Sequence, residues 1–460
     1  MINENEKPSL AERLRESVSL KMAVVGFLIL VLLIPVGMLL GVVAERSQLR
    51  DSAAEDILRG WGGRQLIAGP LLLVPATVVQ TDAYERRVTS RNMNILPESL
   101  AFEAVLDPQV LYRGIHEVPV YRATVSVRGV LRVPSADPAG PDVQTLDFAR
   151  AKFAMAVADA AALRATPVLH IGGREIPFTA GGSLQAGWPP HIVAEVGEVL
   201  AAAGPRAELP FRVELDFTGG ERLQFLPLAD ATHVSVEAPW AAPSFIGRHL
   251  PQERQVEDDG FTAEWQLTGL GRPLPAEWLD GTLDTAAALE SAFGVELYEP
   301  VDLYQKTERA TKYAVLFIGL SFVAYFLFET MGRFLLHPMQ YLLVGFANAL
   351  FYLLLLSLAE HIGFGLAYLA SAVASILLIA GYSQSVLRSS RRAGVMAALL
   401  AGLYGFLYLV LRAEDYAMLA GAVGLWCILG TIMYLTRHVD WYRPGATAAP
   451  TCSAPRRARP

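Results

Sequence analysis

The chain has 460 residues, of which 53% are hydrophobic and 18% are charged, and its formal net charge is −7 at pH 7. This composition is too apolar for an ordinary soluble protein and too charged for a protein that lies wholly in a membrane. No basic stripe with interleaved aromatic residues is present, and we therefore expect no nucleic-acid partner.

The charged residues are concentrated in one part of the chain. Residues 45–312 hold 24 Lys and Arg against 36 Asp and Glu and contain no long apolar run. Both cysteines, Cys427 and Cys452, lie outside this segment, so it has no disulfide. At this length a domain can bury a sufficient core without one. We expect residues 45–312 to form a large water-soluble domain between membrane segments.

The N-terminal region is typical of a retained signal anchor. Residues 1–21 are polar with four basic residues, and we expect them to be cytoplasmic. Residues 22–44 are predicted to form the first transmembrane helix, because the apolar run is longer than the core of a cleavable signal peptide. Gly37 and Gly41 have the GxxxG spacing that permits close helix packing, although a chance pair fits as well. Residues 44–60 predict a helix that continues out of the membrane.

The soluble domain has the pattern of many short strands. Phe211, Val213, Leu215 and Phe217 share one face of a predicted strand, residues 218–220 predict a hairpin turn, and a return strand follows. Gly and Pro recur at short intervals elsewhere in the domain. We expect a β-rich, sandwich-like domain, with helical interruptions at residues 159–164 and 283–293.

Five further apolar runs follow the soluble domain. They predict a five-helix transmembrane bundle, residues 313–436, with spans at 313–331, 339–358, 362–387, 394–411 and 416–436. The expected fold class is therefore a membrane protein of mixed α and β structure, with six transmembrane helices arranged as one plus five around the β-rich domain. Residues 437–460 are basic and rich in Pro and Ala, which predicts a disordered cytoplasmic tail.

The distribution of basic residues predicts the topology. With six spans, the segments on the side of the termini hold 13 Lys and Arg, whereas the two short loops on the other side hold only Arg412. Cytoplasmic loops are enriched in Lys and Arg. Both termini are therefore expected in the cytoplasm and residues 45–312 outside the cytoplasmic membrane, in the periplasm of a bacterium.

Catalytic signatures are not found in the sequence. It has no P-loop, HExxH, GxSxG, CxxC or SxxK motif, and five histidines in the soluble domain lack ligand spacing and are interpreted as satisfied or solvent-facing, namely His116, His170, His191, His233 and His249. We therefore expect no enzyme activity, no cofactor and no metal. A hydrolase whose site is assembled from distant residues is the least favoured alternative.

The candidate functional residues lie at the edges of the predicted spans. They are Glu329, His337, Glu360 and His361. Charged groups within a membrane often belong to ion or proton pathways, and Glu329 lies 16 residues into its span. The favoured interpretation is that these residues cap helix ends or reach the interface, and a proton or cation relay is the alternative. Polar residues at mid-span are explained by helix packing: Asn348, Ser371, Ser375, Tyr404 and Tyr408.

Several stretches resemble one family of bacterial membrane proteins. They are RATKYAVLFIGLSFVAYFLFET at 309–330, LLHPMQYLLVGFANALFYLLLLSLAEHIGF at 335–364, GPLLLVP at 69–75, LPESL at 96–100, APWAAPSFIGRHLP at 238–251 and GFTAEWQL at 260–267. These stretches are similar to the CreD family, also called cell envelope integrity proteins. The resemblance implies an inner-membrane protein with a periplasmic domain, a role in envelope integrity and regulation by a two-component stress system. It implies no catalytic residues.

Two functions from different classes remain. The first is a non-enzymatic protein that maintains the cell envelope, anchored in the lipid bilayer, whose periplasmic domain binds an envelope component or protein partner. The second is a proton- or ion-coupled transporter that uses the helix bundle, with Glu329, Glu360 and His361 as coupling groups.

Overall fold

The fold is described from a computed structural model of the chain. The described residues are 18–81, 86–134, 143–181, 189–272, 274–282, 286–297, 303–332, 336–412 and 416–437. The contacts divide the chain into two compact units, residues 50–301 and residues 1–49 with 302–460. The expected cytoplasmic residues 1–17 and the tail beyond residue 437 lie outside the described residues.

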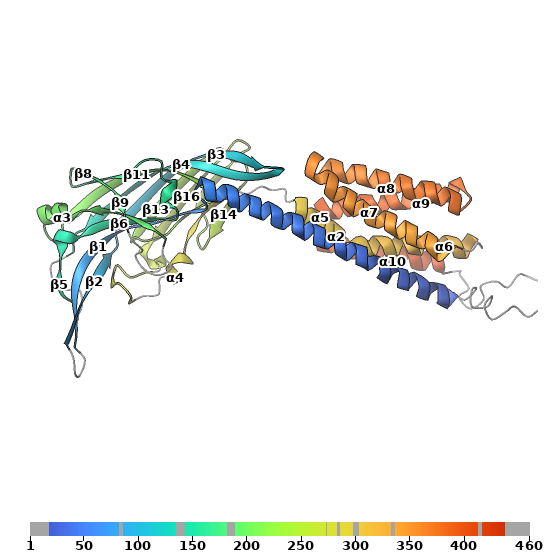
Figure 1. The fold of residues 1–460 in the computed structure, drawn as a ribbon, viewed down its shortest axis with the longest axis horizontal. Coiled ribbons are helices and arrows are strands. Elements are labelled where there is room, and N and C mark those ends of the chain that lie inside the picture. The colour runs from blue at the N-terminus through green and yellow to red at the C-terminus, as the bar shows by residue number, and fades with distance from the viewer. Residues whose placement is uncertain are drawn as a thin grey trace, which may run out of the picture. The chain divides into compact units, whose positions relative to one another are not determined.

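Unit 50–301 contains two large β-sheets (Figure 1). The first has the order β14-β18-β12-β1-β6-β10-β9, with β2 and β5 also paired to β1 and β17 paired to β2. The second has the order β15-β16-β13-β3-β4-β11-β7-β8. The strands of the first sheet are β1 (Gln65–Thr81), β2 (Arg86–Ile95), β5 (Val143–Leu146), β6 (Lys152–Val157), β9 (Thr179–Ala180), β10 (His191–Glu195), β12 (Arg222–Phe225), β14 (Pro243–Gly247), β17 (Glu277–Leu279) and β18 (Phe293–Leu297). Those of the second are β3 (Ser99–Arg113), β4 (His116–Arg132), β7 (Val168–Ile171), β8 (Arg174–Pro177), β11 (Glu208–Gly220), β13 (Ala231–Ala238), β15 (Glu253–Val256) and β16 (Phe261–Thr268).

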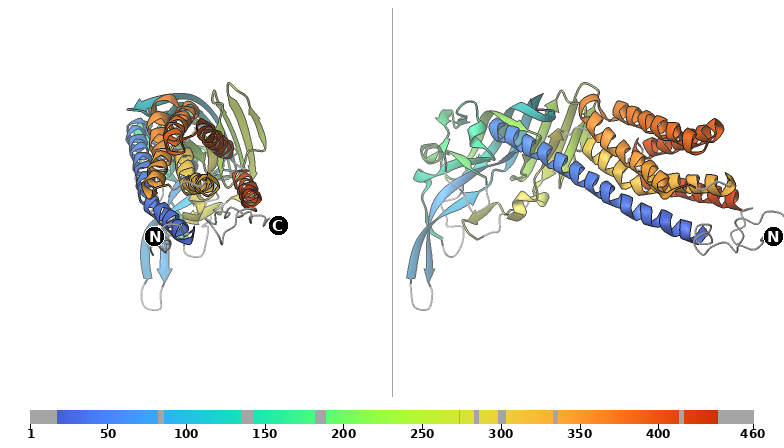
Figure 2. Two further views of the ribbon diagram at one scale, coloured as in Figure 1. Left: turned by 90° about the vertical axis from the view of Figure 1, so that its right-hand side faces the viewer. Right: turned by 45° about the vertical axis from the view of Figure 1, so that its right-hand side comes forward.

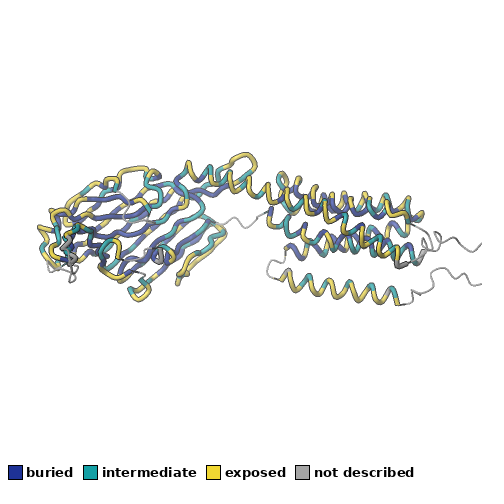
Figure 3. The backbone as a smooth tube through the Cα atoms, turned by 60° about the horizontal axis from the view of Figure 1, so that its bottom comes forward, coloured by how far each residue is buried: buried dark blue, intermediate teal, exposed yellow. Residues whose placement is uncertain are grey.

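The two sheets pack face to face as a sandwich. Phe102 of β3 meets Phe225 of β12 at 5.2 Å between ring centroids, and Phe153 of β6 meets Phe211 of β11 at 5.0 Å. One continuous apolar core fills the space between the sheets, and in Figure 3 the strands alternate between buried and exposed positions. The expected mixture of α and β structure with a sheet-rich domain is therefore confirmed.

Strand β11 confirms one prediction and corrects another. Phe211, Val213, Leu215 and Phe217 are all buried on one face, as their alternation predicts. The predicted hairpin after this strand is wrong, because β11 pairs with β4 and β7 in one sheet whereas β12 pairs with β1 and β18 in the other. Gly219 and Gly220 are required for close packing instead of a turn: a Cβ on Gly219 would lie 2.5 Å from the Tyr121 hydroxyl.

The helical elements of the sandwich are short. They are α3 (Gly197–Ala203), α4 (Ala286–Leu289) and the 3-10 turns η1 (Phe148–Arg150), η2 (Ala160–Ala162) and η3 (Gly269–Gly271). The expected interruption at 159–164 is a single 3-10 turn. The expected helix at 283–293 covers only α4 among its described residues, because Phe293 already begins β18.

Helix α2 (Val18–Trp61) contributes to both units. It continues past the first predicted span and ends at Trp61, as residues 44–60 predict. Within unit 50–301, Leu58 packs against Val118 and Val120 of β4. Gly62 follows at a φ of +97°, where a Cβ would lie 2.4 Å from that of Ala162.

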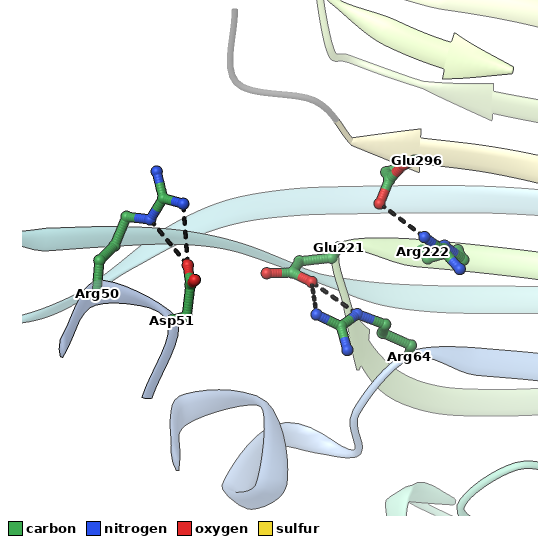
Figure 4. Close-up of polar contacts among 6 residues, drawn as sticks. All are labelled: Arg50, Asp51, Arg64, Glu221, Arg222 and Glu296. Atoms are coloured by element: carbon green, nitrogen blue, oxygen red, sulfur yellow. Dashed lines mark hydrogen bonds and ion pairs between the residues drawn. The ribbon is translucent and has the colours of Figure 1, made fainter. Parts of the chain in front are cut away.

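An ion pair fixes the chain just after this helix. Arg64 donates to Glu221 through Nε at 2.8 Å and pairs with it through its terminal nitrogen at 2.7 Å (Figure 4). Glu221 has a left-handed φ of 57° and connects β11 to β12, the point at which the chain changes sheet. Its neighbour Arg222 pairs with Glu296 of β18 at 3.1 Å (Figure 4).

The second unit is a helix bundle, seen end-on and from the side in Figure 2. Beside the first part of α2 its helices are α5 (Leu303–Lys312), α6 (Ala314–Gly332), α7 (Pro338–Ile362), α8 (Phe364–Val386), α9 (Ser390–Arg412) and α10 (Ala417–Thr436). This unit includes α5, which lies before the boundary at residue 312 that the sequence predicts.

Four helices of the described chain are long and apolar enough to cross a membrane: α2, α7, α8 and α9. Helices α5 and α6 meet at a bend of 40°, and the pair makes a fifth span if it is counted as one. Helix α10 coincides with the sixth predicted span, although its described apolar part, Met418–Tyr434, is shorter. The count of six spans stays a prediction.

Helix α2 packs on α7 through a glycine that the sequence analysis does not single out. Leu32 is fully buried, and a Cβ on Gly345 would lie 2.1 Å from its Cδ1 atom. By contrast, added Cβ atoms on Gly37 and Gly41 would meet no described atom within 4 Å. The GxxxG pair therefore has no packing role among the described residues.

Candidate functional site

The bundle buries a stripe of polar side chains along α6. Ser321, Tyr325 and Glu329 follow one another at four-residue intervals and are 0%, 0% and 5% exposed. Because residues four positions apart lie on the same face of a helix, all three face the bundle interior. A carboxylate in this position requires a partner, since burying an unpaired charge in an apolar environment is costly.

Helices α7, α8 and α9 carry buried polar residues toward the same interior. We call the whole set the polar core: Ser321, Tyr325, Glu329, Tyr341, Asn348, Tyr352, Tyr368, Ser371, Ser375, Ser383 and Tyr404. Every member is 5% exposed or less. The set is drawn from four helices, so the polar residues of separate spans meet in one region.

Glu329 forms the most highly connected end of the polar core. Lys21 Nζ of α2 lies 2.7 Å from Glu329 Oε1, and the Tyr341 hydroxyl donates to Oε2 at 2.8 Å. The side chain of Glu329 is 4% exposed, whereas that of Lys21 is 28% exposed. The carboxylate is thus buried and paired, and its cation retains access to solvent.

Hydrogen bonds continue from this end into the middle of the bundle. Tyr325 hydrogen-bonds Ser383, and Asn348 donates to Ser321 Oγ at 3.1 Å. The Tyr404 hydroxyl donates to Asn348 Oδ1 at 3.3 Å, and the Tyr368 hydroxyl donates to the Tyr404 carbonyl oxygen at 2.7 Å. These contacts join α6, α7, α8 and α9.

Two hydroxyls of the polar core lack a hydrogen-bond partner among the described residues. They are the Tyr352 hydroxyl and Ser371 Oγ, and both side chains are almost completely buried. Buried polar groups in proteins are nearly always hydrogen-bonded, to protein or to ordered water. The middle of the bundle therefore has unsatisfied hydrogen-bonding capacity.

The second carboxylate, Glu360, lies near the opposite end of α7. The Tyr304 hydroxyl of α5 donates to Glu360 Oε1 at 3.2 Å, and Arg46 Nε of α2 lies 3.9 Å from the same atom. The side chain of Glu360 is 9% exposed. Each end of α7 therefore brings a carboxylate together with a tyrosine and a cation from α2.

The four predicted residues separate into two pairs. Glu329 is buried and Glu360 is partly buried, and both are paired and in contact with other helices, beyond what a simple interfacial position requires. His337 is the N-cap of α7: its Nδ1 accepts from the Met339 backbone N–H at 3.2 Å, and Gln340 completes a capping box. His361 is exposed and its Nδ1 lies 3.0 Å from the Ser357 carbonyl oxygen. Neither histidine contributes to the polar core.

Four partners of the two carboxylates are not predicted from the sequence: Lys21, Arg46, Tyr304 and Tyr341. They come from helices that are far away in the chain, and Lys21 and Glu329 are 308 positions apart. The four-residue spacing of Ser321, Tyr325 and Glu329 is the one signal that could have predicted a buried polar stripe.

The sandwich presents a separate feature, a groove of about 870 Å³ across the outer face of the second sheet. Its floor is made of small residues on three neighbouring strands, Ala231, Ser99 and Ala101 with Gly129. Larger polar side chains flank the floor: Arg128, His233, Gln252 and Gln266. Apolar residues, among them Val130 and Pro210, complete the lining.

A charged cleft of about 490 Å³ adjoins one end of the groove, since Glu98 and Asp230 directly precede Ser99 and Ala231. Within the cleft Arg132 pairs with Glu98 at 2.7 Å and with Glu208 at 3.1 Å, while Arg272 pairs with Asp230 at 2.5 Å. The cleft therefore contains positive and negative side chains, and most of them form ion pairs with one another.

Metal and acid–base chemistry have little support in the described parts of the chain. No group of three or more His, Cys, Asp or Glu residues there is placed to hold a metal ion. Of the sandwich histidines, His191 and His249 are not satisfied as expected, because His191 Nδ1 and His249 Nε2 are buried without a described partner. Burial lowers the pKa of both, with smaller contributions from Lys152 and Arg248 respectively.

The long apolar helices and the buried polar core define the class of this protein as a multi-span membrane protein. Two comparisons with known proteins agree with this class. The family described as "Inner membrane protein CreD" matches residues 17–442. The chain is also 31% identical to the inner membrane protein CreD of Escherichia coli (strain K12) over 419 residues, which cover 90% of this chain and 91% of that protein.

The chain therefore belongs to the CreD family of inner membrane proteins. This membership confirms the predicted resemblance and supports a multi-pass protein of the bacterial inner membrane.

Proposed function

We propose that this protein is a non-enzymatic maintenance protein of the cell envelope. Its sandwich faces the periplasm and binds an extended polar envelope component in the groove of the second sheet, while the helices anchor it in the inner membrane. The single observation that carries this proposal is the groove, a trench on the outer face of the second sheet with a floor of small residues flanked by polar side chains.

The form of the groove supports a polymer as the ligand. Its floor crosses strands β13, β3 and β4 at right angles to their direction, so that side chains of several strands contact one ligand. The amide groups of Gln252 and Gln266, the guanidinium of Arg128 and the imidazole of His233 provide hydrogen bonds along its length. Such a lining is suited to a glycan or peptide strand.

The basic residues support the placement of the sandwich. Segments assigned to the cytoplasm hold 13 Lys and Arg against one on the other side. On this assignment the groove opens to the compartment that contains the peptidoglycan and the inner face of the outer membrane.

Filling the groove tests the proposal. Ala101→Tyr places a large ring on the floor from the outward face of β3, without changing the core. Val105→Tyr is the matched control, because Val105 is 56% exposed on the same face of the same strand and does not line the groove. Full-length protein in detergent is incubated with purified peptidoglycan and, separately, with lipopolysaccharide, and the bound fraction is measured.

We expect the wild type and Val105→Tyr to bind one of the two probes. Ala101→Tyr should bind the same probe at least tenfold more weakly. Equal binding by all three proteins, or binding to neither probe, would overturn the proposal.

A further inference from the structure

We propose that the helix bundle conducts protons along the polar core between Glu329 and Glu360. This activity concerns a different unit from the groove of the sandwich and does not depend on what the groove binds. It is carried by three observations: a carboxylate near each end of α7, polar side chains at nearly every level between them, and two buried hydroxyls without a partner.

The distance between the two ends fits a membrane. Tyr341, which donates to Glu329, and Glu360 are 19 positions apart on α7. At a rise of 1.5 Å per residue this corresponds to about 28 Å. The hydrocarbon core of a bilayer is about 30 Å thick. The two carboxylates therefore lie close to the two faces that a proton must enter and leave.

Polar groups occupy the levels between these carboxylates. On α6 the stripe of Ser321, Tyr325 and Glu329 supplies one group per helical turn, about every 6 Å. Asn348 and Tyr352 continue it on α7, at the level where Asn348 contacts Ser321. On α8, Ser375, Ser371 and Tyr368 extend it toward the end of α7 that carries Glu360.

The unpartnered hydroxyls indicate where water belongs. The hydroxyl of Tyr352 and Ser371 Oγ lie in the half of the polar core that has the fewest direct hydrogen bonds. A water molecule bonded to such groups satisfies them and also relays protons between neighbours. Helix packing alone explains buried serines, but it gives no reason for buried hydroxyls without a described partner between the carboxylates of Glu329 and Glu360.

Charged and hydroxyl groups face the carboxylate at each end of the proposed path. Glu329 faces Lys21 from α2 and Tyr341 from α7, with Tyr325 one turn away on its own helix. Glu360 faces Arg46 from α2 and Tyr304 from α5, next to His361 on its own helix. A proton taken up by one carboxylate passes through hydroxyls and water, each of which accepts one proton and donates one, and leaves from the other carboxylate. No bond other than O–H bonds changes, and the proton gradient drives the transfer.

Proton flux into liposomes tests this inference. Full-length protein is reconstituted into liposomes that contain a pH-sensitive dye, and a potassium gradient with valinomycin imposes a membrane potential. The variants are Glu329→Gln, Glu360→Gln and Tyr352→Phe, the last of which removes only a hydroxyl without a described partner. Thr431→Val is the control, because Thr431 is an exposed residue of α10 whose hydroxyl donates to the Cys427 carbonyl oxygen of the same helix at 2.8 Å.

We expect wild type and Thr431→Val to change the internal pH faster than protein-free liposomes. Each Gln variant should lose at least tenfold of this flux, and Tyr352→Phe should lose severalfold while it retains the thermal stability of the wild type. A wild type no faster than protein-free liposomes would overturn the inference. Proton flux at the wild-type rate in correctly folded Tyr352→Phe, Glu329→Gln and Glu360→Gln would also overturn it.

Discussion

At the scale of single residues, Glu329 shows how the membrane unit handles a buried charge. Its carboxylate receives one hydrogen bond from Tyr341 and an ion pair from Lys21, so both oxygens are satisfied. Removing one partner of a buried pair leaves an uncompensated charge, which is usually more harmful than removing both. This asymmetry gives a direct test of the pair.

We predict that Lys21→Met lowers the free energy of unfolding by about 2 kcal/mol, less than for a fully buried pair because Lys21 is partly exposed. The double variant Lys21→Met with Glu329→Gln should lose less than the sum of the two single changes. Thermal unfolding of the full-length protein in detergent measures this cycle. Additive losses would show that the two side chains do not interact.

Two histidines of the sandwich, buried His191 and partly buried His249, predict a pH dependence of stability. Burial lowers the pKa of His191 and His249, so the unfolded chain, in which histidine has a pKa of about 6.5, binds more protons than the folded chain just below that pH. The stabilisation from the neutral histidines is therefore fully present above about pH 6.5 and is lost as the pH falls toward their folded values.

We expect the unfolding temperature of the wild type to fall between about pH 7.5 and pH 5.5, and His191→Gln with His249→Gln to show a shallower fall. His170→Gln is the control, because the side chain of His170 is half exposed. Differential scanning fluorimetry across this range measures the slope. An unchanged slope in the double variant would contradict the assignment.

Residue identities in the candidate site were predictable only in part. Glu329 and Glu360 are recognisable because they interrupt apolar runs, whereas Lys21 belongs to a different part of the chain and carries no signal of its partner. His337 is a candidate functional residue from the sequence because it is titratable, but in the structure it caps the N-terminus of α7. The partners of a buried charge depend on tertiary packing, which local pattern does not encode.

At the scale of elements, local pattern predicts the strands and helices well where burial has a clear period. Strand β11 alternates as its sequence predicts, and α2 ends at Trp61 before two glycines. The failed hairpin has a physical reason: Gly219 and Gly220 resemble a turn signal, but they are needed where Tyr121 and Leu58 approach the backbone. The sequence shows that a glycine is present, but it does not show whether the glycine forms a turn or leaves room for a neighbouring side chain.

The contact between α2 and α7 gives a prediction at this scale. Gly345→Val should lower the free energy of unfolding by about 1–3 kcal/mol, because its side chain would overlap Leu32. Leu32→Ala in the same protein should recover part of this loss by vacating the space. Thermal unfolding in detergent measures both. Gly381→Val on α8 is the matched control, since a Cβ there meets nothing within 4 Å, and a loss as large as that of Gly345→Val would contradict the account.

At the scale of the whole molecule, the chain combines a packed β-sandwich with a bundle that buries polar side chains. The split of charge along the sequence predicts this division, because residues 45–312 hold most of the acidic groups and none of the long apolar runs. The register of the sheets was not predictable, since β13 pairs with β3 in parallel across more than 100 residues of chain. The groove depends on that register and was therefore not predictable either.

The proposed topology can be tested by labelling. With Cys427 and Cys452 replaced by Ser, we expect Leu270→Cys, at a sandwich residue that is 99% exposed, to react with a membrane-impermeant maleimide in intact spheroplasts. Ser390→Cys, at the exposed first residue of α9 in the segment assigned to the cytoplasm, should react only after permeabilisation. The reverse pattern would place the sandwich in the cytoplasm and contradict the proposed function.

The most direct test of the central claim is envelope permeability in cells that lack this gene. Dye uptake and detergent sensitivity are measured after complementation with the wild type, Ala101→Tyr or Val105→Tyr, at matched protein levels. The account predicts that the wild type and Val105→Tyr restore the barrier and that Ala101→Tyr leaves it permeable. Full restoration by Ala101→Tyr would show that the groove does not carry the function of this protein in the envelope.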